Sequence, residues 1–512
     1  MRGKKALVAA APWLWLVLTS VGARPLVAQT ASPYVPLHHW AMPYVEHLIS
    51  TGAIVDPTPL TRPIRQSDLL RALEAADTSG PGGAARATVR RLLEEFRPHV
   101  TGSHYRVALG AGLAAASYTV RDPLEMDRGV PPRQAMRRGF ASGSGEVLLA
   151  FGPFVAVTDP TVDTRLQYDP DWRAIENTAT RWEEGYVTGQ WRYGEAFFGI
   201  LDRNWGPSGV QGVLLSDDPY SMDHLSLSIG TERVRLSTIA TQLDPIDTGA
   251  VVNRYQIHHR LWIKPGGPRG RWTVALWEAS VLSGVGRSLE PWYLNVATLS
   301  FLRQGRGPNA NSFAGFDVER RARSTLFGQV MLDDVQLSRQ TATDRKPASY
   351  AFTVGAKGRL ARALAWTVFY TQVANLTYRN EDDQQVPLYH SLGTGRNFSD
   401  YDQATVKASW LTRPGLLLEP EVTVLRQGEG DPRLPHPLPP AYPTTATLFE
   451  GVVQRVVRLA VGGSWQYHGF SVTGSGGLHL IHNVGHVAGA NDTRWLGSLG
   501  VTYRLAWERA LP

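Results

Sequence analysis

Two adjacent aspartates, Asp333 and Asp334, could act as a general acid and base, the roles that paired carboxylates play in many enzymes. Neighbouring residues of a β-strand, however, point to opposite faces, so the two carboxylates converge on one substrate only if a β-bulge intervenes. We therefore predict a structural role, in which one aspartate caps a turn or pairs with a nearby arginine. The candidate partners are Arg320, Arg321 and Arg323.

Three histidines near the C-terminus suggest a metal site. His479 and His482 face opposite ways in a strand, whereas His482 and His486 share a face but lie about 13 Å apart at ~3.3 Å per residue. One zinc ion needs each nitrogen at ~2.0–2.1 Å, so strand geometry excludes a shared ion and only a looped segment would allow one. Two further pairs are adjacent and diverge in the same way, namely His38–His39 and His258–His259. We expect neither a metal nor another cofactor.

The turn-like segment Asp202–Gly209 contains the aromatic residue that we single out, Trp205, directly before a Gly-Pro pair. An aromatic ring can stack on a sugar face, and Arg203 and Asn204 can donate hydrogen bonds to hydroxyl or acidic groups. The alternative is that Trp205 anchors a tight turn. The sequence leaves both roles open.

Enzyme motifs with a defined local geometry are absent from the sequence. There is no Gly-x-Ser-x-Gly elbow, no phosphate-binding Walker loop and no dinucleotide fingerprint in a strand-turn-helix setting. The chain contains 0 cysteines, which excludes disulfides, thiolate metal sites and a cysteine nucleophile. We predict that the protein is not an enzyme. The alternative is a barrel enzyme acting on lipid or glycan, which would need a nucleophile and a base that converge in space.

The chain begins with the pattern of a secretory signal peptide. Basic residues precede an apolar run, Ala6–Val21, and small residues up to Ala28 offer cleavage sites. We predict a signal peptide over residues 1–28, with an uncleaved signal anchor as the alternative. The apolar run is short for the ~20 residues that a membrane-spanning helix needs. The protein is therefore expected to be exported.

From about residue 102 onward, apolar residues recur at every second position, the period of β-strands. The last segment is the clearest, because Val501, Tyr503, Leu505 and Trp507 alternate with small or charged residues. One face suits lipid and the other a wet interior, so residues 102–512 predict an all-β transmembrane antiparallel barrel. At about 23 residues per strand and connection, the barrel has on the order of 18 strands. A propeller would show a repeat of ~40 residues, and we find none.

Residues 34–100 carry the 3.6-residue period of amphipathic helices instead. The pattern predicts one helix that Gly52 ends, a second capped by Ser67 and a third over Ala84–Phe96. The apolar residues that define them are Val45, Leu48 and Ile49, then Leu69, Leu70 and Leu73, then Val89, Leu92, Leu93 and Phe96. Three such helices are too small to bury a core of their own. We expect this N-terminal helical segment to cap or plug the periplasmic end of the barrel.

Composition agrees with a membrane barrel. The chain holds 16 Trp, 18 Tyr and 15 Phe, and interfacial girdles of barrels use such residues. The net charge of +7, with 52 lysines and arginines, favours anionic partners such as lipopolysaccharide phosphates or acidic glycans. A simple solubility excess explains the charge equally well. No nucleic-acid partner is expected.

Four segments stand out, in order along the chain. They are Tyr44–Gly52 with Thr61–Leu69, Asp202–Gly209 with Leu214–Ser216 and Pro219, Leu276–Glu278 with Pro291–Leu294, and Phe316–Asp317 with Leu326–Asp334. Together they resemble the capsule assembly Wzi proteins of the Gram-negative outer membrane. The second is similar to the family's Trp-Gly-Pro-Gly turn, although Asn204 stands where the family often has another tryptophan. The fourth is similar to the family's strand that ends in paired aspartates.

The resemblance implies an outer-membrane barrel of about eighteen strands with periplasmic helices, which holds exported capsular polysaccharide at the cell surface and catalyses no known reaction. Capsular or other acidic polysaccharide, lipopolysaccharide and outer-membrane lipid are the expected partners. The candidate polysaccharide-binding residues are Arg203, Asn204, Trp205, Asp317, Asp333 and Asp334. A general or substrate-selective porin is the alternative, and it differs in having an open lumen.

Overall fold

The computed structural model describes residues 31–77, 83–98, 100, 102–125, 138–176, 178–298, 310–335, 341 and 345–511. The signal peptide expected over residues 1–28 lies outside these ranges, so export stays a prediction. Within the described ranges, no helix is both long and apolar enough to cross a membrane.

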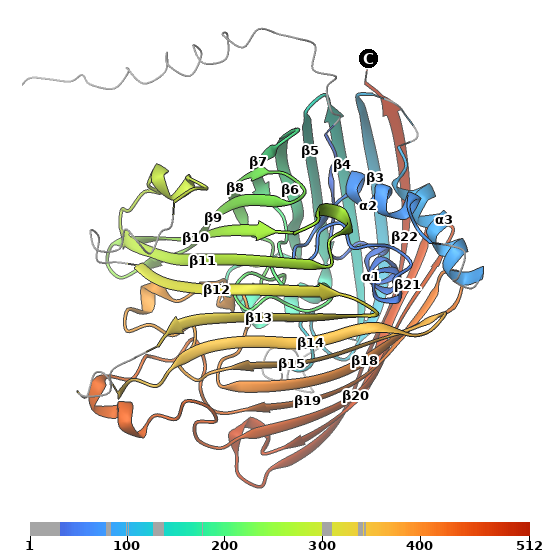
Figure 1. Ribbon diagram of the computed structural model, residues 1–512. Coiled ribbons are helices and arrows are strands. Elements are labelled where there is room, and N and C mark those ends of the chain that lie inside the picture. The colour runs from blue at the N-terminus through green and yellow to red at the C-terminus, as the bar shows by residue number, and fades with distance from the viewer. Residues whose placement is uncertain are drawn as a thin grey trace, which may run out of the picture.

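Eighteen strands of the described residues form one closed antiparallel barrel (Figure 1). The strands follow one another around the barrel in chain order, and β22 closes it by pairing with β3, from Ser498 opposite Ala116 to Ala510 opposite His104. Closure leaves no unpaired edge, which a strand in lipid could not tolerate. The predicted fold class is confirmed.

The barrel strands have the following bounds: β3 His104–Ala116, β4 Gly139–Phe151, β5 Phe154–Asp163, β6 Thr180–Trp191, β7 Gly194–Ile200, β8 Asp223–Gly230, β9 Val234–Asp247, β10 Val251–Ile263, β11 Trp272–Val285, β12 Ala310–Arg321, β13 Ser324–Asp334, β14 Ser349–Ala361, β15 Leu364–Val373, β18 Tyr401–Arg413, β19 Leu416–Gln427, β20 Gln454–Tyr467, β21 Phe470–His482 and β22 Asn491–Ala510. Two short two-stranded sheets are separate from the barrel wall. They pair β1 (Tyr34–Val35) with β2 (Ile64–Arg65), and β16 (Leu388–Tyr389) with β17 (Leu392–Gly393).

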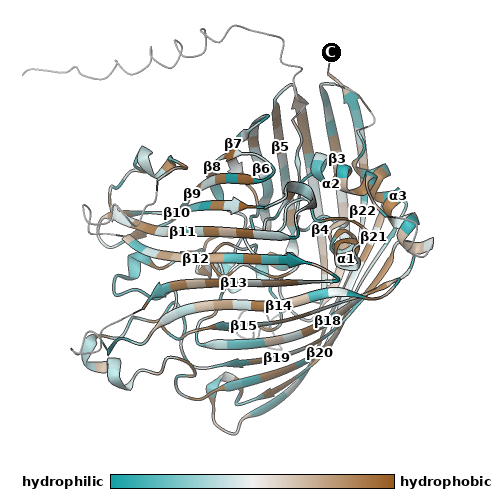
Figure 2. Ribbon diagram, in the orientation of Figure 1, coloured by the Kyte–Doolittle hydropathy of each residue, from teal (hydrophilic) through white to brown (hydrophobic). Residues whose placement is uncertain are grey.

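Apolar and polar residues alternate along the strands, as the brown and teal bands of Figure 2 show. On β22 the outward apolar residues, each between 39% and 52% exposed, are Val501, Tyr503, Leu505 and Trp507. Arg504, between two of them, points inward and donates to Glu146 of β4 at 2.6 Å. The two faces of the strand therefore differ as the sequence predicted.

Three helices precede the barrel: α1 Met42–Thr51, α2 Gln66–Glu74 and α3 Gly83–Phe96. Gly52 ends α1 in the left-handed conformation, at φ 75°, and its N–H donates to the Ile49 carbonyl at 3.0 Å. The expected cap of the second helix was wrong: α2 begins at Gln66, and Ser67 lies inside it. The reason is that β2 runs directly into the helix, so Arg65 takes the cap position without a side-chain hydrogen bond.

The helices share their hydrophobic core with the barrel wall, since Leu411 of β18 and Leu417 of β19 are buried among the helix side chains. The Tyr44 hydroxyl of α1 also donates to the Gly415 carbonyl, at 3.0 Å, in the turn between those two strands. The helices therefore lie at the end of the barrel where two-residue turns join the strands (Figure 1). The long connections lie at the opposite end.

Candidate functional site

The connection between β7 and β8, residues 201–222, folds back into the barrel, and we call it the inner loop. Gln329 of β13, which is 1% exposed and lies on the inward face of its strand, accepts the Val213 N–H at 2.8 Å and donates to the Trp205 carbonyl at 2.7 Å. Lys357, inward on β14, donates to the Ser208 hydroxyl. These contacts with the inner wall place the loop in the lumen.

A second connection, residues 374–400, packs on the inner loop. The Ser216 N–H donates to the Thr394 carbonyl at 2.9 Å, and the Arg396 guanidinium donates to the Gln211 side chain at 3.1 Å. The inner loop is thus held from the barrel wall and from a neighbouring connection.

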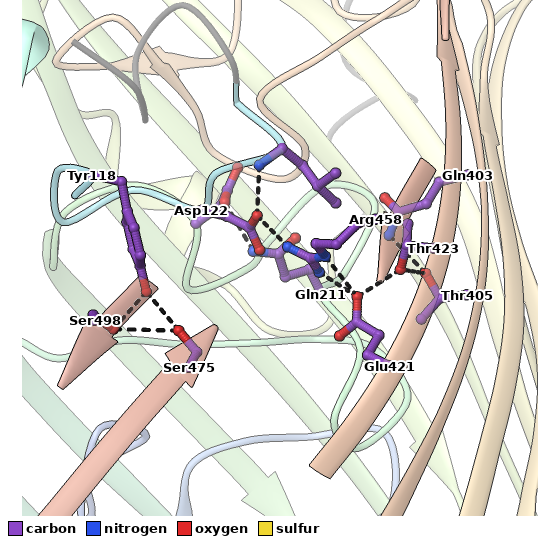
Figure 3. A network of polar contacts seen from close by, with 12 residues as sticks. Tyr118, Asp122, Gln211, Gln403, Thr405, Glu421, Thr423, Arg458, Ser475 and Ser498 are labelled. Carbon is purple, nitrogen blue, oxygen red and sulfur yellow. Dashed lines mark hydrogen bonds and ion pairs between the residues drawn. The ribbon is translucent and has the colours of Figure 1, made fainter. Parts of the chain in front are cut away.

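The connection between β3 and β4 also reaches the inner wall of the barrel. Asp122 accepts a hydrogen bond from Arg458 of β20 at 2.7 Å, and Arg458 donates through Nε to Glu421 of β19 at 3.0 Å (Figure 3). On the other side, the Tyr118 hydroxyl contacts the hydroxyls of two serines, on β21 and β22, each 2.7 Å away (Figure 3). This connection therefore lies across part of the lumen.

The N-terminal segment and the inner loop meet at Arg62 and Asn204. Their backbones exchange two hydrogen bonds, of 2.9 and 3.1 Å. The Asn204 side chain, in a residue 6% exposed, donates to the Val210 carbonyl at 3.0 Å and accepts the Gly212 N–H at 2.8 Å. An asparagine amide can make both bonds at once, so this residue closes the inner loop on itself.

Arg62 is 2% exposed and pairs with two carboxylates, Glu46 at 2.8 Å and Asp56 at 2.9 Å. Burial acts to raise the pKa of Asp56, but the charge and hydrogen bonds of Arg62 outweigh it and hold this pKa below its ordinary value. Sequence reasoning did not single out Arg62, because its partners stand 16 and 6 residues away and no spacing motif links them.

Trp205 is buried, with 7% of its surface exposed. The Arg260 guanidinium lies over its ring, 4.9 Å from the centroid, and the His258 ring meets it edge-on at 5.7 Å. Leu215 and Met222 pack around it in the same cluster. Of the two roles that the sequence left open, this packing favours the anchor of a turn, since little of the ring is accessible to a sugar in this conformation.

Asp317 of β12 is fully buried and satisfied by three donors: Arg260 at 2.5 Å, Trp277 at 2.8 Å and Gln329 at 2.7 Å. Arg260 also donates to the Leu60 carbonyl, at 2.9 Å, and so ties the wall to the N-terminal segment. We call Arg62, Asn204, Trp205, Arg260 and Asp317 the lumen junction. Three of the predicted binding residues, Asn204, Trp205 and Asp317, therefore converge here. Their contacts are with other residues of the protein.

Arg203 diverges from its neighbours Asn204 and Trp205. Its Nε lies 3.1 Å from the His224 ring nitrogen, and its guanidinium lies over the rings of Tyr34, at 4.7 Å, and Phe197, at 4.5 Å. The structure thus brings Arg203 to the aromatic cluster beside β7 and not to the lumen junction.

Asp333 and Asp334 lie at the far end of β13 and bind different groups. Asp333 accepts the Tyr378 N–H at 2.9 Å, and Asp334 pairs with Lys346 at 2.9 Å. The register shifts between Leu332 and Asp334, so a bulge does occur, yet the carboxylates bind separate partners. The predicted arginine partners were wrong, because Arg320, Arg321 and Arg323 stand at the short-turn end of the same hairpin.

A cavity of about 310 Å³ separates α1 from the inner loop and from the wall formed by β15, β18 and β19. Its charged lining includes Glu46, Arg62, Lys407 and Glu419. This volume is at the lower end for a small-molecule site. The cavity can hold water or a small polar solute.

One serine and histidine converge in this cavity, at 2.8 Å between His47 Nδ1 and Ser409 Oγ. Burial lowers the pKa of His47 to about 4, far from the value near the working pH that an efficient general base needs. Within the described residues, no carboxylate accepts a hydrogen bond from the other ring nitrogen of His47. This pair therefore lacks the arrangement of a catalytic triad.

Two of the three C-terminal histidines form hydrogen bonds within the protein. His482 contacts the Asn491 side chain at 2.6 Å, and His486 contacts the Val452 carbonyl at 2.7 Å. In the part of the chain that the structure describes, no group of three or more histidine, aspartate or glutamate residues has the geometry to hold a metal ion.

Comparison with known proteins places the fold. No family model and no curated protein matches the chain. Among solved structures, it is similar to Wzi of Escherichia coli, with a TM-score of 0.61, 12% sequence identity and coverage of 94% of this chain and 99% of that one. The chain shares the fold of Wzi. The resemblance stated from the sequence is thus confirmed for the fold.

Wzi is described as an outer-membrane protein involved in group 1 capsule assembly and as a carbohydrate-binding β-barrel. Two Pseudomonas aeruginosa proteins overlap with the chain less well. OprD has a TM-score of 0.44 at 10% identity, over 80% of this chain and 97% of that one. OccK11 has a TM-score of 0.42 at 12% identity, over 79% and 96%. Scores at this level do not support an argument about function.

Proposed function

We propose that this protein is an outer-membrane barrel that binds and organises exported polysaccharide at the cell surface, without catalysing a reaction. Its fold, shared with a barrel described as carbohydrate-binding, supports this proposal. Capsular or other acidic polysaccharide is the proposed ligand, and lipopolysaccharide and membrane lipid surround the barrel.

The outer face of the barrel supports a place in the membrane. Large apolar side chains project from it, among them Trp495, Leu113 and Phe198, which are 77%, 71% and 65% exposed. An apolar surface of this extent is unfavourable in water and suits lipid. Short turns of outer-membrane barrels face the periplasm, so the helices lie on that side and the long connections face outward.

The observation that carries the proposal is the contact between Arg62 and Asn204. The N-terminal segment enters from the short-turn end, the inner loop enters from the other, and their backbones are hydrogen-bonded to each other. A lumen occupied in this way suits a protein that holds a polymer outside the cell better than one that conducts solutes.

A substrate-selective porin is the second candidate, and one observation favours it. Thr473 and Thr502 alternate with outward apolar residues and therefore face inward, yet both are exposed. On β3, Gly112 lies opposite Thr502 and Gly110 opposite Arg504. The lumen is thus less filled on this side than around the lumen junction, which is compatible with a narrow passage for small polar solutes.

Two measurements on the detergent-purified protein test the proposal. A faster-running band in unboiled gel samples, which becomes slower after boiling, is expected of a closed barrel. Polysaccharide purified from the source organism, immobilised on a sensor, should retain the folded protein, and an unrelated dextran should not. Absence of binding to that polysaccharide by a heat-modifiable barrel would contradict the proposed function.

A further inference from the structure

A second cavity, also of about 310 Å³, is lined by residues of the connection between β5 and β6. We call it the surface pocket, and its lining residues are Gln167, Tyr168, Arg173, Glu176 and Thr178. Tyr168 is half-buried and the other four are exposed. The pocket belongs to the long-connection end of the barrel, which faces outward in the proposed orientation.

The backbone beneath the surface pocket is held in place by side chains. The 3-10 helix η1 (Thr164–Tyr168) is capped by Asp163, which accepts the Arg165 N–H at 2.8 Å. The short helix α5 (Pro170–Arg173) is capped in the same way by Asp169. These caps fix the chain on both sides of Gln167 and Tyr168, and α5 carries Arg173.

The inward side of this connection is fastened to the inner loop. Trp172 donates its indole N–H to the Thr178 carbonyl at 2.7 Å, and its ring meets Tyr220 edge-on at 4.9 Å. The Tyr220 hydroxyl donates to Asp169 at 2.5 Å. The pocket is therefore preformed on a packed base, which reduces the entropy that a ligand must overcome on binding.

The polar side chains of the pocket are available to a ligand. Within the described residues, the side chains of Gln167, Arg173, Glu176 and Thr178 make no hydrogen bond or ion pair with the protein, although all four border one cavity. Together they offer guanidinium and amide donors and carboxylate, amide and hydroxyl acceptors. Such a mixture matches the adjacent hydroxyl groups of a sugar, each of which both donates and accepts.

Tyr168 supplies an aromatic surface beside these groups. Its ring packs edge-on against Phe140, with the centroids 5.8 Å apart, which fixes its orientation. An aromatic ring with an apolar face and a polar tip suits a ligand that is apolar on one face and polar at its edge, as a pyranose is.

The charges of the pocket restrict the chemical class of the ligand further. Arg173 and Glu176 carry opposite charges, so the lining is neutral as a whole, and the Glu176 carboxylate opposes a strongly anionic group. We propose that the surface pocket binds one sugar residue of the exported polysaccharide through its uncharged hydroxyl groups, with the sugar ring against Tyr168. This inference rests on the proposed function and assigns a binding site to it, one that differs from the residues expected from the sequence.

The test compares variants for binding to immobilised polysaccharide from the source organism, in parallel with the gel assay for a folded barrel. Tyr168→Ala should weaken binding about threefold to tenfold, since one aromatic contact is lost. Glu176→Gln keeps the shape of the side chain but removes its charge, and should weaken binding by a similar factor. Ile175→Ala changes an exposed neighbour that is not among the lining residues, and should bind as the wild type does.

The outcomes separate this inference from the proposed function. If the wild type binds the polysaccharide and folded Tyr168→Ala and Glu176→Gln bind equally well, the surface pocket is not the site, while the proposed function stands. If the wild type does not bind, the proposed function fails as well. Binding should persist at about 0.5 M salt, because hydroxyl recognition is screened little; its loss there would contradict the uncharged class of ligand.

Discussion

Arg62 and Asn204, from opposite ends of the barrel, exchange two backbone hydrogen bonds in the lumen. One residue belongs to the segment that carries the N-terminal helices, and the other to the inner loop. Each is fixed separately, Arg62 by its carboxylates Glu46 and Asp56, and Asn204 by the backbone of its own loop. The contact therefore joins two elements that are each fixed by their own contacts, and it explains how chain segments occupy this part of the lumen.

Replacing Asn204 by alanine should loosen the inner loop. The variant loses two buried side-chain hydrogen bonds, and a cost of about 1–3 kcal/mol in the free energy of unfolding is expected. Asn204→Ala should also show more frequent or larger openings than the wild type in planar lipid bilayers. The control is Asn253→Ala, which loses a side-chain bond to the Arg287 carbonyl away from the lumen junction. If both variants conduct alike, the inner loop does not close the barrel.

Replacing Asp317 by asparagine should destabilise the barrel strongly. Arg260 is then left buried without its carboxylate, and loss of one partner of a buried ion pair costs about 3–5 kcal/mol. Urea unfolding, followed by tryptophan fluorescence and by the gel assay, measures the change. The double variant Arg260→Met, Asp317→Leu removes both charges and should recover part of the loss. A single variant as stable as the wild type would show that the pair is not needed.

Asp159 and Glu184 face each other directly across β5 and β6, and both are buried. No lysine or arginine of the described residues forms an ion pair with either. Like charges opposite one another are unfavourable, so Glu184→Gln should stabilise the protein, by about 0.5–1 kcal/mol. The midpoint of urea unfolding should move upward in this variant, whereas Glu183→Gln, which breaks an ion pair with Arg181, should lower it. A fall in both midpoints would contradict this reading of the acidic pair.

The long connections should become less stable as the pH rises. Burial, and then the nearby Asp218, raise the pKa of Glu125 to about 8, and burial with Glu183 raises the pKa of Asp202 to about 7. The folded state then binds more protons than the unfolded state above the ordinary carboxyl range, so this stability is full in acid and is lost as the pH rises through about 7 to 8. Asp56, whose pKa is lowered, has the opposite effect. It contributes stability at neutral pH that is lost only as the pH falls below its ordinary pKa.

Limited proteolysis of the intact protein in detergent at pH ~5.5 and ~8.5 measures this effect. Cleavage within the long connections should be faster at the higher pH after correction for the activity of the protease. Glu125→Gln keeps a polar partner for Asn397 and should reduce the difference between the two conditions. Faster cleavage at the lower pH would have the wrong sign for buried carboxyl groups.

The barrel could be predicted from the sequence because every strand has one face toward lipid and one toward the interior. That difference produces the two-residue period, which is visible on β22 as Val501 to Trp507. The helices could be predicted from their 3.6-residue period for the same reason. The start of α2 was misplaced at Ser67, since the pairing of β2 with β1 sets the helix start and involves residues distant in the chain.

The candidate site was predicted less well. Trp205 and Asn204 were recognised as unusual residues, and Asp317 belongs to the same network, but their roles depend on whether the inner loop folds inward or outward. No local pattern encodes that choice, because it is decided by partners such as Gln329 and Arg260 on distant strands. The surface pocket could not be predicted from the sequence. Its aromatic and polar residues follow no motif, and only the fold of the β5–β6 connection brings them together.

The conductance of single wild-type molecules in planar lipid bilayers tests the central claim most directly. The account predicts a barrel that inserts into the bilayer but stays closed or opens only briefly, because the N-terminal segment and the inner loop are joined at Arg62 and Asn204. Large and steady openings in the wild type would contradict it and would favour the porin.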